Sequence, residues 1–364
     1  MIKKFYSEYD VVTVARQRIK NIFKTAPKVR MSISGGKDSI VLQDIVYKLC
    51  CSGEIDKSKL EIDFIDEEAI YPCVERVTKN IRLKWKSIGV TFNWWCIEVK
   101  HFNCFNMLTN DESFICWDRH KKDVWVRQMP PFAITEHPLL RKRKDTYQDF
   151  LARLSKGSVT IVGVRASESV QRLNMIASHN NVTNFNMYPI YDMHDKDIWF
   201  YIKQNGLEIP DAYLYMYQVG VPKNRLRISQ FFSIDTAASL VNMCEYYPSL
   251  FDKICKREPN AYIAMLYYDT EMFRRAKNKT QVNQDEKINW KKKTLDVIKK
   301  DEFFTTATAK KTQKKYKQLI TSYATVIQEQ EWKTIYGAIT AGDPKLRTYR
   351  SLYTTIFNKH SNGK

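Results

Sequence analysis

The first half of the chain alternates between stretches with helical spacing of apolar residues and short runs typical of strands. The apolar spacing predicts helices from Asp10 to Ala26, from Asp38 through Leu49 and from Pro72 to Ile88. The runs KVRMSIS, KLEIDFID, VTFNWWCIEV and SVTIVGVR are rich in β-branched and aromatic residues and predict four strands. Strands that alternate with helices indicate an α/β fold, with a mainly parallel, doubly wound sheet covered on both faces.

Two regions depart from this alternation. Residues from about 100 to 150 contain WDRHKKDVWVRQMPPF and RKRKDTYQDF, and they are predicted to form an insertion over the edge or the ligand face of the sheet. After about Pro210 the pattern is helical and the strand signals fade. We therefore expect one α/β domain over residues 1–230 and a helical, basic C-terminal region over residues 231–364.

The chain has 364 residues and a formal net charge of +19. This excess favours a polyanionic partner such as nucleic acid, and a lysine-rich solvated surface is the alternative. The segment Lys287–Gln318 holds eleven lysines. Four aromatic residues are interleaved with them and are expected to stack on bases while the lysines contact phosphates. These aromatic residues are Trp290, Phe303, Phe304 and Tyr316.

Apolar runs and cysteines bear on the location of the protein. No apolar run approaches the roughly 20 residues of a membrane span, and the N-terminus has no apolar signal core, so a cytoplasmic protein with no membrane contact is expected. The eight cysteines include no Cys-x-x-Cys pair and are expected to be reduced. The spacing of His, Asp and Cys residues predicts no protein-held metal site.

The six residues Ser34-Gly35-Gly36-Lys37-Asp38-Ser39 lie between a predicted strand and a predicted helix. The first N–H groups of a helix lack helical partners and favour an anion. The glycines allow a tight turn, the serine hydroxyls and Lys37 can bind phosphate, and Asp38 can cap the helix or help to hold Mg²⁺. An ordinary glycine turn is the alternative. The spacing excludes both the Walker and the dinucleotide-binding patterns.

This loop resembles the PP-loop of the ATP-pyrophosphatase superfamily, which grips the β,γ-pyrophosphate of ATP. Three further segments resemble the phosphoadenosine phosphosulfate (PAPS) reductase family in the family's order, over residues 25–230: FIDEEAIYP, VGVRASESVQR and MYPIYDMHDKDIWFYIKQNGLEIPDAYLYMY. The last of these segments ends in a proline followed by a tyrosine-rich stretch. The resemblance implies an adenine nucleotide alpha-hydrolase-like fold that binds ATP or a PAPS-like nucleotide, with Mg²⁺.

The resemblance and the residue types together assign the site. The expected catalytic residues are Lys37, Asp38 and Arg165, and Asp66 is expected to contact the nucleoside. Arg165 and Arg172 can bind phosphate or sulfate bidentately, and surface ion pairs with Glu168 are the alternative. The remaining binding candidates are Ser34, Gly35, Gly36, Ser39, Gly163, Glu168, Arg127, Arg225 and Arg227.

The chain also departs from the family. It has no cysteine after Cys255, no terminal Glu-Cys-Gly element and no cysteine pairs that would complete a cluster, so no iron–sulfur cluster is expected. The chain also has an aromatic and basic middle segment, CWD…WVRQMP, and an arginine-rich segment, NRLRISQFF. In these segments it resembles a subgroup of the family described as co-activators of prophage gene expression. That resemblance implies a phage or prophage connection and a ParB/sulfiredoxin-like protein partner.

Three functions follow as hypotheses. The first is adenylation of a substrate with release of pyrophosphate, linked to nucleic-acid modification or regulation. The second is sulfonucleotide reduction with a cysteine outside the family position. Cys116 is the candidate, because four basic residues follow it closely, and a packed cysteine beside Trp117 is the alternative. The third is a non-catalytic, nucleotide-sensing and DNA-associated regulator.

Overall fold

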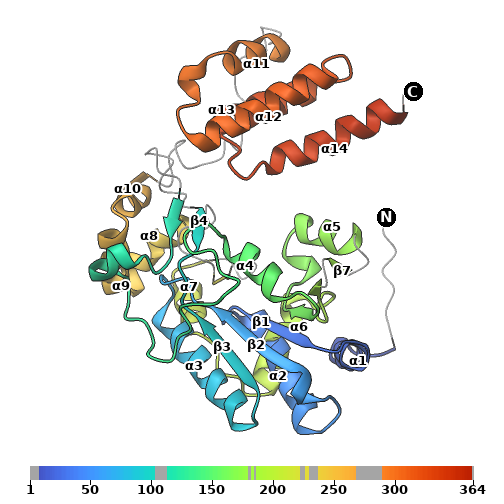
Figure 1. The fold of residues 1–364 in the computed structure, drawn as a ribbon, viewed down its shortest axis with the longest axis vertical. Coiled ribbons are helices and arrows are strands. Elements are labelled where there is room, and N and C mark those ends of the chain that lie inside the picture. The colour runs from blue at the N-terminus through green and yellow to red at the C-terminus, as the bar shows by residue number, and fades with distance from the viewer. Residues whose placement is uncertain are drawn as a thin grey trace. The chain divides into compact units, whose positions relative to one another are not determined.

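The computed structural model describes residues 8–102, 113–178, 182–183, 186–221, 226–228, 237–267 and 289–362. The chain folds as two compact units (Figure 1). Described residues within 1–102 and 114–261 form the first unit, and those from 262 onward form the second together with Ser113. Helices α8 (Ala237–Tyr246) and α9 (Pro248–Arg257) therefore belong to the first unit, although their helical pattern had placed them in the C-terminal region.

A six-stranded sheet with the order β3-β2-β1-β6-β8-β7 forms the centre of the first unit. All neighbouring strands are parallel except the short pair β7 and β8. The strands are β1 (Val29–Ile33), β2 (Leu60–Ile65), β3 (Thr91–Trp95), β6 (Val159–Val162), β7 (Val182–Thr183) and β8 (Asn186–Met187). A mainly parallel sheet flanked by helices confirms the expected α/β fold class.

Helices cover both faces of this sheet. Because βαβ crossovers are right-handed, α2 and α3 share one face while α4 and α5 lie on the other, as Figure 1 shows. The Asp10 carboxylate accepts from the N–H groups of Val12 and Thr13 and so fixes the start of the first helix. The helices of this unit, besides α8 and α9, are α1 (Val11–Thr25), α2 (Lys37–Cys51), α3 (Pro72–Ser87), α4 (Tyr147–Leu154), α5 (Val170–Ser178), α6 (Asp195–Gln204) and α7 (Ala212–Gln218). The boundary between the two units falls within α10 (Asn260–Tyr267).

The third predicted strand is shorter than its pattern indicated. The run VTFNWWCIEV predicted a strand to Val99, but β3 ends at Trp95. The Cys96 N–H donates to the carbonyl of Ile134 at 3.0 Å, and Trp95 forms a parallel bridge with the same residue. The described part of the predicted insertion therefore pairs along the outer edge of β3. It also contributes β4 (Lys100–Phe102) and β5 (Ser113–Ile115), which form a separate two-stranded sheet.

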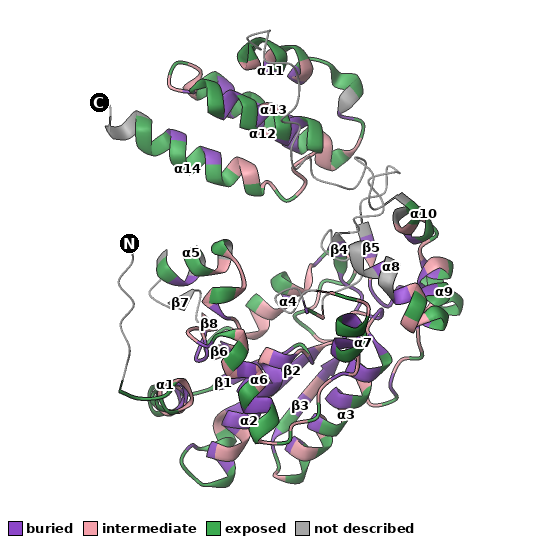
Figure 2. Ribbon diagram, turned by 180° about the vertical axis from the view of Figure 1, so that it is seen from behind, coloured by how far each residue is buried: buried purple, intermediate pink, exposed green. Residues whose placement is uncertain are grey.

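One face of the sheet carries a buried polar ladder. Arg30 of β1 is 3% exposed and donates from Nε and Nη2 to the Asp63 carboxylate of β2 at 2.8 and 2.7 Å. Its Nη1 donates to Glu61 at 2.6 Å, and the indole N–H of Trp95 on β3 donates to Asp63 at 2.9 Å. Figure 2 shows the central strands as largely buried. The ion pairs join β1 to β2, and the Trp95 hydrogen bond adds β3, where parallel sheets are usually apolar on both faces.

The second unit has its own apolar core within the described residues. Its helices are α11 (Trp290–Ile298), α12 (Ala307–Tyr323), α13 (Glu329–Ala341) and α14 (Arg347–Asn362). Tyr316 is fully buried in this core, and its hydroxyl donates to Asp343 at 2.8 Å. The expectation of a helical C-terminus is confirmed. In the described part of the chain, no helix combines the length and the apolar character needed to cross a bilayer.

Candidate functional site

A cavity of about 400 Å³ opens at the carboxyl ends of β1, β2 and β6. After β1, the chain adds β2 and then β3 on one side of this strand, and it later adds β6 on the other side. The cavity therefore lies at the point where the strand order reverses. Open α/β sheets bind ligands at this position. Nine of the predicted site residues line the cavity: Ser34, Gly36, Lys37, Asp38, Ser39, Gly163, Glu168, Arg172 and Arg227.

The loop between β1 and α2 depends on Gly35. Its φ is +73°, and a Cβ built there would lie 2.7 Å from Val74 Cγ1 and 2.8 Å from Thr78 Oγ1. The residue therefore needs glycine both for its left-handed backbone and for its close approach to α3. Gly35 does not line the cavity. It shapes the turn that presents the first N–H groups of α2 to the cavity.

Gly163 holds the loop from the other side. A Cβ on this residue would lie 3.1 Å from the carbonyl carbon and oxygen of Asp38 and from Ser39 Cα. A side chain at this position would press on the backbone of the first turn of α2, so glycine favours the close packing of the end of β6 on that turn. The Ser39 hydroxyl donates to the Gly36 carbonyl at 2.9 Å, which tightens the same turn.

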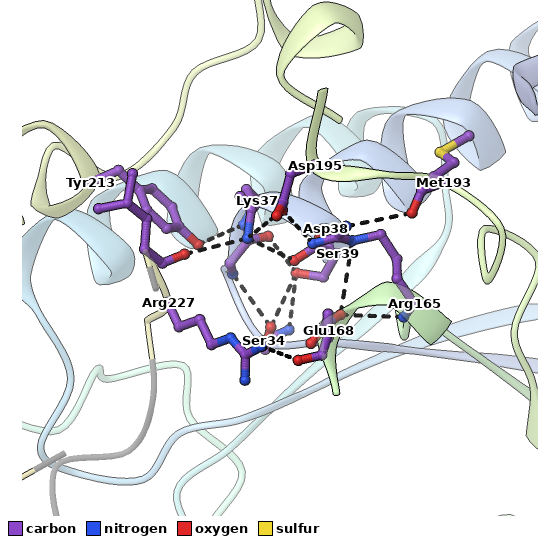
Figure 3. A network of polar contacts seen from close by, with 12 residues as sticks. Ser34, Lys37, Asp38, Ser39, Arg165, Glu168, Met193, Asp195, Tyr213 and Arg227 are labelled. Atoms are coloured by element: carbon purple, nitrogen blue, oxygen red, sulfur yellow. Dashed lines mark hydrogen bonds and ion pairs between the residues drawn. The ribbon is translucent and has the colours of Figure 1, made fainter. Parts of the chain in front are cut away.

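Lys37 and Tyr213 meet at the start of α2 (Figure 3). The backbone N–H of Lys37 donates to the Tyr213 hydroxyl at 2.9 Å, and the Lys37 side chain is 4% exposed. Its ammonium contacts Asp38 at 3.3 Å and the Leu226 carbonyl at 3.3 Å. Tyr213 comes from α7, in the tyrosine-rich stretch that resembled the family, but sequence reasoning did not select it. The resemblance was the signal that would have found it.

Arg165 lies behind the loop rather than in the cavity. Its side chain is 2% exposed, and its Nε donates to Asp38 at 2.6 Å while Nη2 donates to Asp195 at 2.7 Å (Figure 3). It does not line the cavity. Asp195, which sequence reasoning did not single out, also lies 3.8 Å from the Lys37 ammonium. This geometry makes Arg165 a residue that positions Asp38, and its predicted direct contact with phosphate stays a prediction.

Arg172 and Arg227 bring positive charge to the cavity wall. Arg172 forms an ion pair with Glu168, and Arg227 donates to the Glu168 backbone carbonyl. Burial and the neighbouring guanidinium of Arg227 lower the pKa of Arg172. Two guanidinium groups that repel each other beside a helix N-terminus favour an anion between them. The ion pair between Arg172 and Glu168 was the alternative raised for this arginine from the sequence.

Asp66 and Arg127 are directed at each other and not at the cavity. Asp66 is 1% exposed, forms an ion pair with Arg127, and accepts from the indole N–H of Trp94 at 2.7 Å. Arg127 also lies 3.0 Å from Glu75. Neither residue lines the cavity. Arg225 lies outside the described residues, so its predicted contact has no structural counterpart here.

The opposite wall of the cavity is mainly apolar. The segment from Phe64 to Tyr71 supplies most of it, and Glu67 is its charged member. Tyr147 of α4 also lines the cavity, and burial together with Glu67 raises its pKa to about 12. Nothing in the sequence pattern marked either residue as functional. The cavity thus combines a cationic, N–H-rich end with an apolar slot, as nucleotide sites do.

On their own, the side chains at the cavity provide few free ligands for Mg²⁺. Both carboxylate oxygens of Asp38 contact cations, Oδ1 with Arg165 and Oδ2 with Lys37. Within the described ranges, no group of three or more His, Cys, Asp or Glu side chains could hold a metal ion. Magnesium commonly binds through one or two carboxylates plus substrate phosphates, so we expect it to arrive with a nucleotide.

The structure argues against Cys116 as a reactive thiol. Cys116 is fully buried, and its thiol lies 3.5 Å from the Glu67 carbonyl. Burial raises the pKa of this thiol well above its ordinary value, and the carboxylates of Glu67 and Glu68 raise it further. The prediction that the basic residues after Cys116 would activate it is wrong, because the folded chain surrounds the thiol with acidic groups. No described cysteine lines the cavity.

We expect Cys116 to resist alkylation in the native protein. At pH 8, iodoacetamide should label the exposed Cys51 while Cys116 stays unmodified, because the buried thiol is protonated and inaccessible. Peptide mapping by mass spectrometry measures both sites, and labelling in urea provides the control in which both react. Equal labelling of the two cysteines in the native protein would contradict this assignment.

The lysine-rich segment does not present its aromatic residues as predicted. Phe304 is 3% exposed and Tyr316 is fully buried, so both pack in the core of the second unit and cannot stack on bases. Trp290 is half-buried against Tyr336. Lys287 and the side chain of Phe303 lie outside what the structure describes. The lysines of α11 and α12 are mostly exposed, and their contact with phosphates stays a prediction.

Comparisons with known proteins agree with the family indicated by the motifs. Residues 134–234 match the model of the phosphoadenosine phosphosulfate reductase domain. The matched segment includes the cavity residues from Gly163 to Arg227 and begins after the loop at residues 34–39. The resemblance to this family is confirmed for that segment. The uncharacterized protein YbdN of Escherichia coli (strain K12) is 27% identical over 272 residues, which cover 68% of this chain and 65% of YbdN.

Several solved structures are similar at a low level. The U34-tRNA thiolase NcsA of Methanococcus maripaludis with its [4Fe-4S] cluster has 13% identity and a TM-score of 0.33, covering 71% of this chain and 81% of its own. The PAPS reductase of Candida auris in a phosphate complex has 11% identity and a TM-score of 0.34, covering 64% and 98%. At these TM-scores the similarity does not bear on function, and none of the names refers to prophage genes.

Proposed function

We propose that this chain, whose residues 134–234 match the PAPS reductase domain, binds ATP in the cavity and transfers its adenylyl group to an acceptor. The acceptor's nucleophile forms a bond to the α-phosphorus, the bond to the bridging oxygen of the β-phosphate breaks, and pyrophosphate leaves. The observation that carries the proposal is the cavity itself. The cavity has the N-terminus of α2 and two arginines at one end and apolar residues at the other, and it lies where the strand order of the sheet reverses.

In this proposal the α2 end of the cavity holds the pyrophosphate. The N–H groups of Asp38 and Ser39 and the hydroxyl of Ser34 donate to phosphate oxygens. The Ser39 hydroxyl exchanges its contact with the Gly36 carbonyl for a phosphate oxygen. Lys37 exchanges its contact with Asp38 for the phosphate and neutralises charge on the leaving group. Arg172 and Arg227 bind the same oxygens and are relieved of their mutual repulsion.

The residues that line the cavity also bear on the two other functions that the sequence suggested. Sulfonucleotide reduction needs a thiolate beside the nucleotide, and no described cysteine lines the cavity. A nucleotide-sensing regulator would bind ATP without releasing pyrophosphate. We favour nucleic acid as the acceptor class, because residues 289–362 carry fifteen Lys and Arg against six Asp and Glu.

The proposal is tested by measuring ATP binding and Mg²⁺-dependent pyrophosphate release, with and without added RNA or DNA. Lys37→Ala is expected to weaken ATP binding about tenfold to a hundredfold, because a buried charge-assisted contact is lost. Lys24→Ala, which removes an exposed lysine at the end of α1, is the matched control and should bind as the unmodified chain does. Absence of both ATP binding and pyrophosphate release would refute the proposal, and binding without release under all conditions would favour the regulator.

A further inference from the structure

The second unit separates its basic residues from its acidic ones. Helices α12 and α14 contain no Asp or Glu, although they carry eight of the fifteen Lys and Arg residues in the range 289–362. The six acidic residues of this range lie on α11, on α13 or between the α-helices. On α12, Lys311 and Lys315 are four positions apart, a spacing at which like charges destabilise a helix. Because neither helix has a carboxylate of its own to offset this repulsion, the two helices favour an anionic partner.

Helices α12 and α14 pack side by side. The ring centroids of Tyr316 and Tyr349 are 5.5 Å apart, and those of Tyr323 and Tyr353 are 6.0 Å apart. Because the two contacts advance together along both helices, α12 and α14 run in the same direction. The two helices that lack acidic residues therefore contribute to one continuous surface.

Two aromatic side chains are exposed on α14. Tyr353 is 39% exposed and Phe357 is 44% exposed. Their rings are nearly parallel, at 13°, with centroids 6.0 Å apart, and the ring of Tyr349 continues the row at 6.0 Å from Tyr353. Arg350 is also exposed and lies three positions before Tyr353, so it shares this side of the helix. A row of exposed rings beside a cation is a surface on which unpaired bases can stack.

Lysines of α12 border this row. Because successive residues turn by about 100° around a helix, Lys315 lies about 80° from Tyr323, which contacts α14, and Lys317 lies about 120° from it on the opposite flank. The Lys317 ammonium is 3.8 Å from Asp301, so that flank faces the acidic segment before α12. Lys315, which is half-buried, and the exposed Lys311 one turn before it therefore lie on the flank next to α14.

We propose that the surface formed by Lys311, Lys315, Arg350, Tyr353 and Phe357 binds single-stranded nucleic acid. The two exposed rings stack on bases, and the three cations contact phosphates. A duplex keeps its bases stacked inside and cannot use the rings, so the aromatic row selects a single strand. The inference rests on the proposed function in that it names the form of the nucleic-acid acceptor, although none of the five residues lines the cavity.

Fluorescence anisotropy with the full chain, in the absence of ATP, measures this binding. The probes are a labelled single strand of about 16 nucleotides and the duplex of the same sequence, each as DNA and as RNA. We expect the single strand to bind more tightly than the duplex. Tyr353→Leu/Phe357→Leu keeps the apolar packing and removes the rings, so it should weaken single-strand binding about tenfold to a hundredfold without changing its dependence on salt.

The lysines should affect the salt dependence instead. Lys311→Gln/Lys315→Gln should reduce the slope of log affinity against log salt concentration by about 1.4, because each phosphate contact with a single strand contributes about 0.7. Lys292→Gln/Lys299→Gln is the matched control. It removes two exposed charges outside the proposed surface, so the slope should equal that of the unmodified chain. Thermal unfolding checks that every variant is folded.

The outcomes distinguish the inference from the proposed function. Equal affinity for single strand and duplex, unchanged by the leucine substitutions, would overturn the inference, and so would equal slopes for the two pairs of lysine substitutions. Absence of binding to every oligonucleotide would also overturn it, while ATP binding with pyrophosphate release would leave the proposed function standing with another class of acceptor. Oligonucleotide binding with the expected effects of the variants, but without ATP binding or pyrophosphate release, would support the inference and refute the proposed function.

Discussion

Replacing Arg257 with methionine is expected to lower the free energy of unfolding by about 3–5 kcal/mol. Arg257 of α9 donates to both oxygens of Glu68, from Nε at 2.8 Å and from Nη2 at 3.3 Å. Both side chains are almost completely buried, at 1% and 0% exposure. Methionine fills a similar volume but leaves the Glu68 carboxylate without its cation. Urea unfolding followed by tryptophan fluorescence measures the loss.

The double variant Glu68→Gln/Arg257→Met is the control for this prediction. It removes both charges, so most of the lost stability should return, since a buried charge without its partner is the main cost. Glutamine keeps an oxygen that can accept from the Trp117 N–H, which Glu68 binds at 2.8 Å. A single variant that costs less than about 1 kcal/mol, or a double variant as unstable as the single one, would show that the ion pair contributes little.

Gly35→Ala is expected to lower the free energy of unfolding by about 2–5 kcal/mol. A left-handed backbone costs a residue with a side chain roughly 1–2 kcal/mol, and forcing a methyl group into packed surroundings adds roughly 1–3 kcal/mol. The new methyl group would collide with Val74 and Thr78 of α3. Because the loop must shift to relieve this contact, ATP binding should be lost together with the stability. Thermal unfolding and ATP titration measure the two effects.

Gly53→Ala is the matched control. Gly53 has nearly the same backbone angle, with φ +72° against +73° for Gly35, but nothing lies within 4 Å of the position of its Cβ. This substitution should cost only the backbone contribution of about 1–2 kcal/mol and leave ATP binding unchanged. The difference between the two variants isolates the contact between the loop and α3. Equal losses in both would mean that this contact has no energetic role.

Local signals in the sequence predicted much of the fold. The apolar spacing placed the first three helices within two residues of their observed ends. α1 and α3 bury apolar residues at helical spacing, whereas α2 is buried at every position from Ser39 to Val46. The strand between 28 and 34 and the glycine loop after it were also expected, since β-branched residues followed by paired glycines are a local pattern. The resemblance added most of the cavity residues between Gly163 and Arg172.

Contacts between distant residues could not be predicted in this way. Glu68 and Arg257 are 189 positions apart, so no spacing rule links them. The same holds for the Tyr213 hydroxyl at the Lys37 N–H, 176 positions away. Arg165 was expected to bind phosphate because it lies at the carboxyl end of a predicted strand, where open α/β sheets bind ligands. Its contacts with Asp38 and Asp195 join residues 127 and 30 positions apart, so no spacing rule could have linked them.

The ladder of ion pairs around Arg30 has a consequence for how the strands find each other. A slip of one residue between β1 and β2 would carry Arg30 out of line with Asp63 and leave both charges buried without partners. That mismatch would cost several kcal/mol, whereas a slipped apolar face can often repack. The ladder therefore favours the native register of β1 and β2 over misaligned ones. It also sets the level at which the loop after β1 faces the segment after β2.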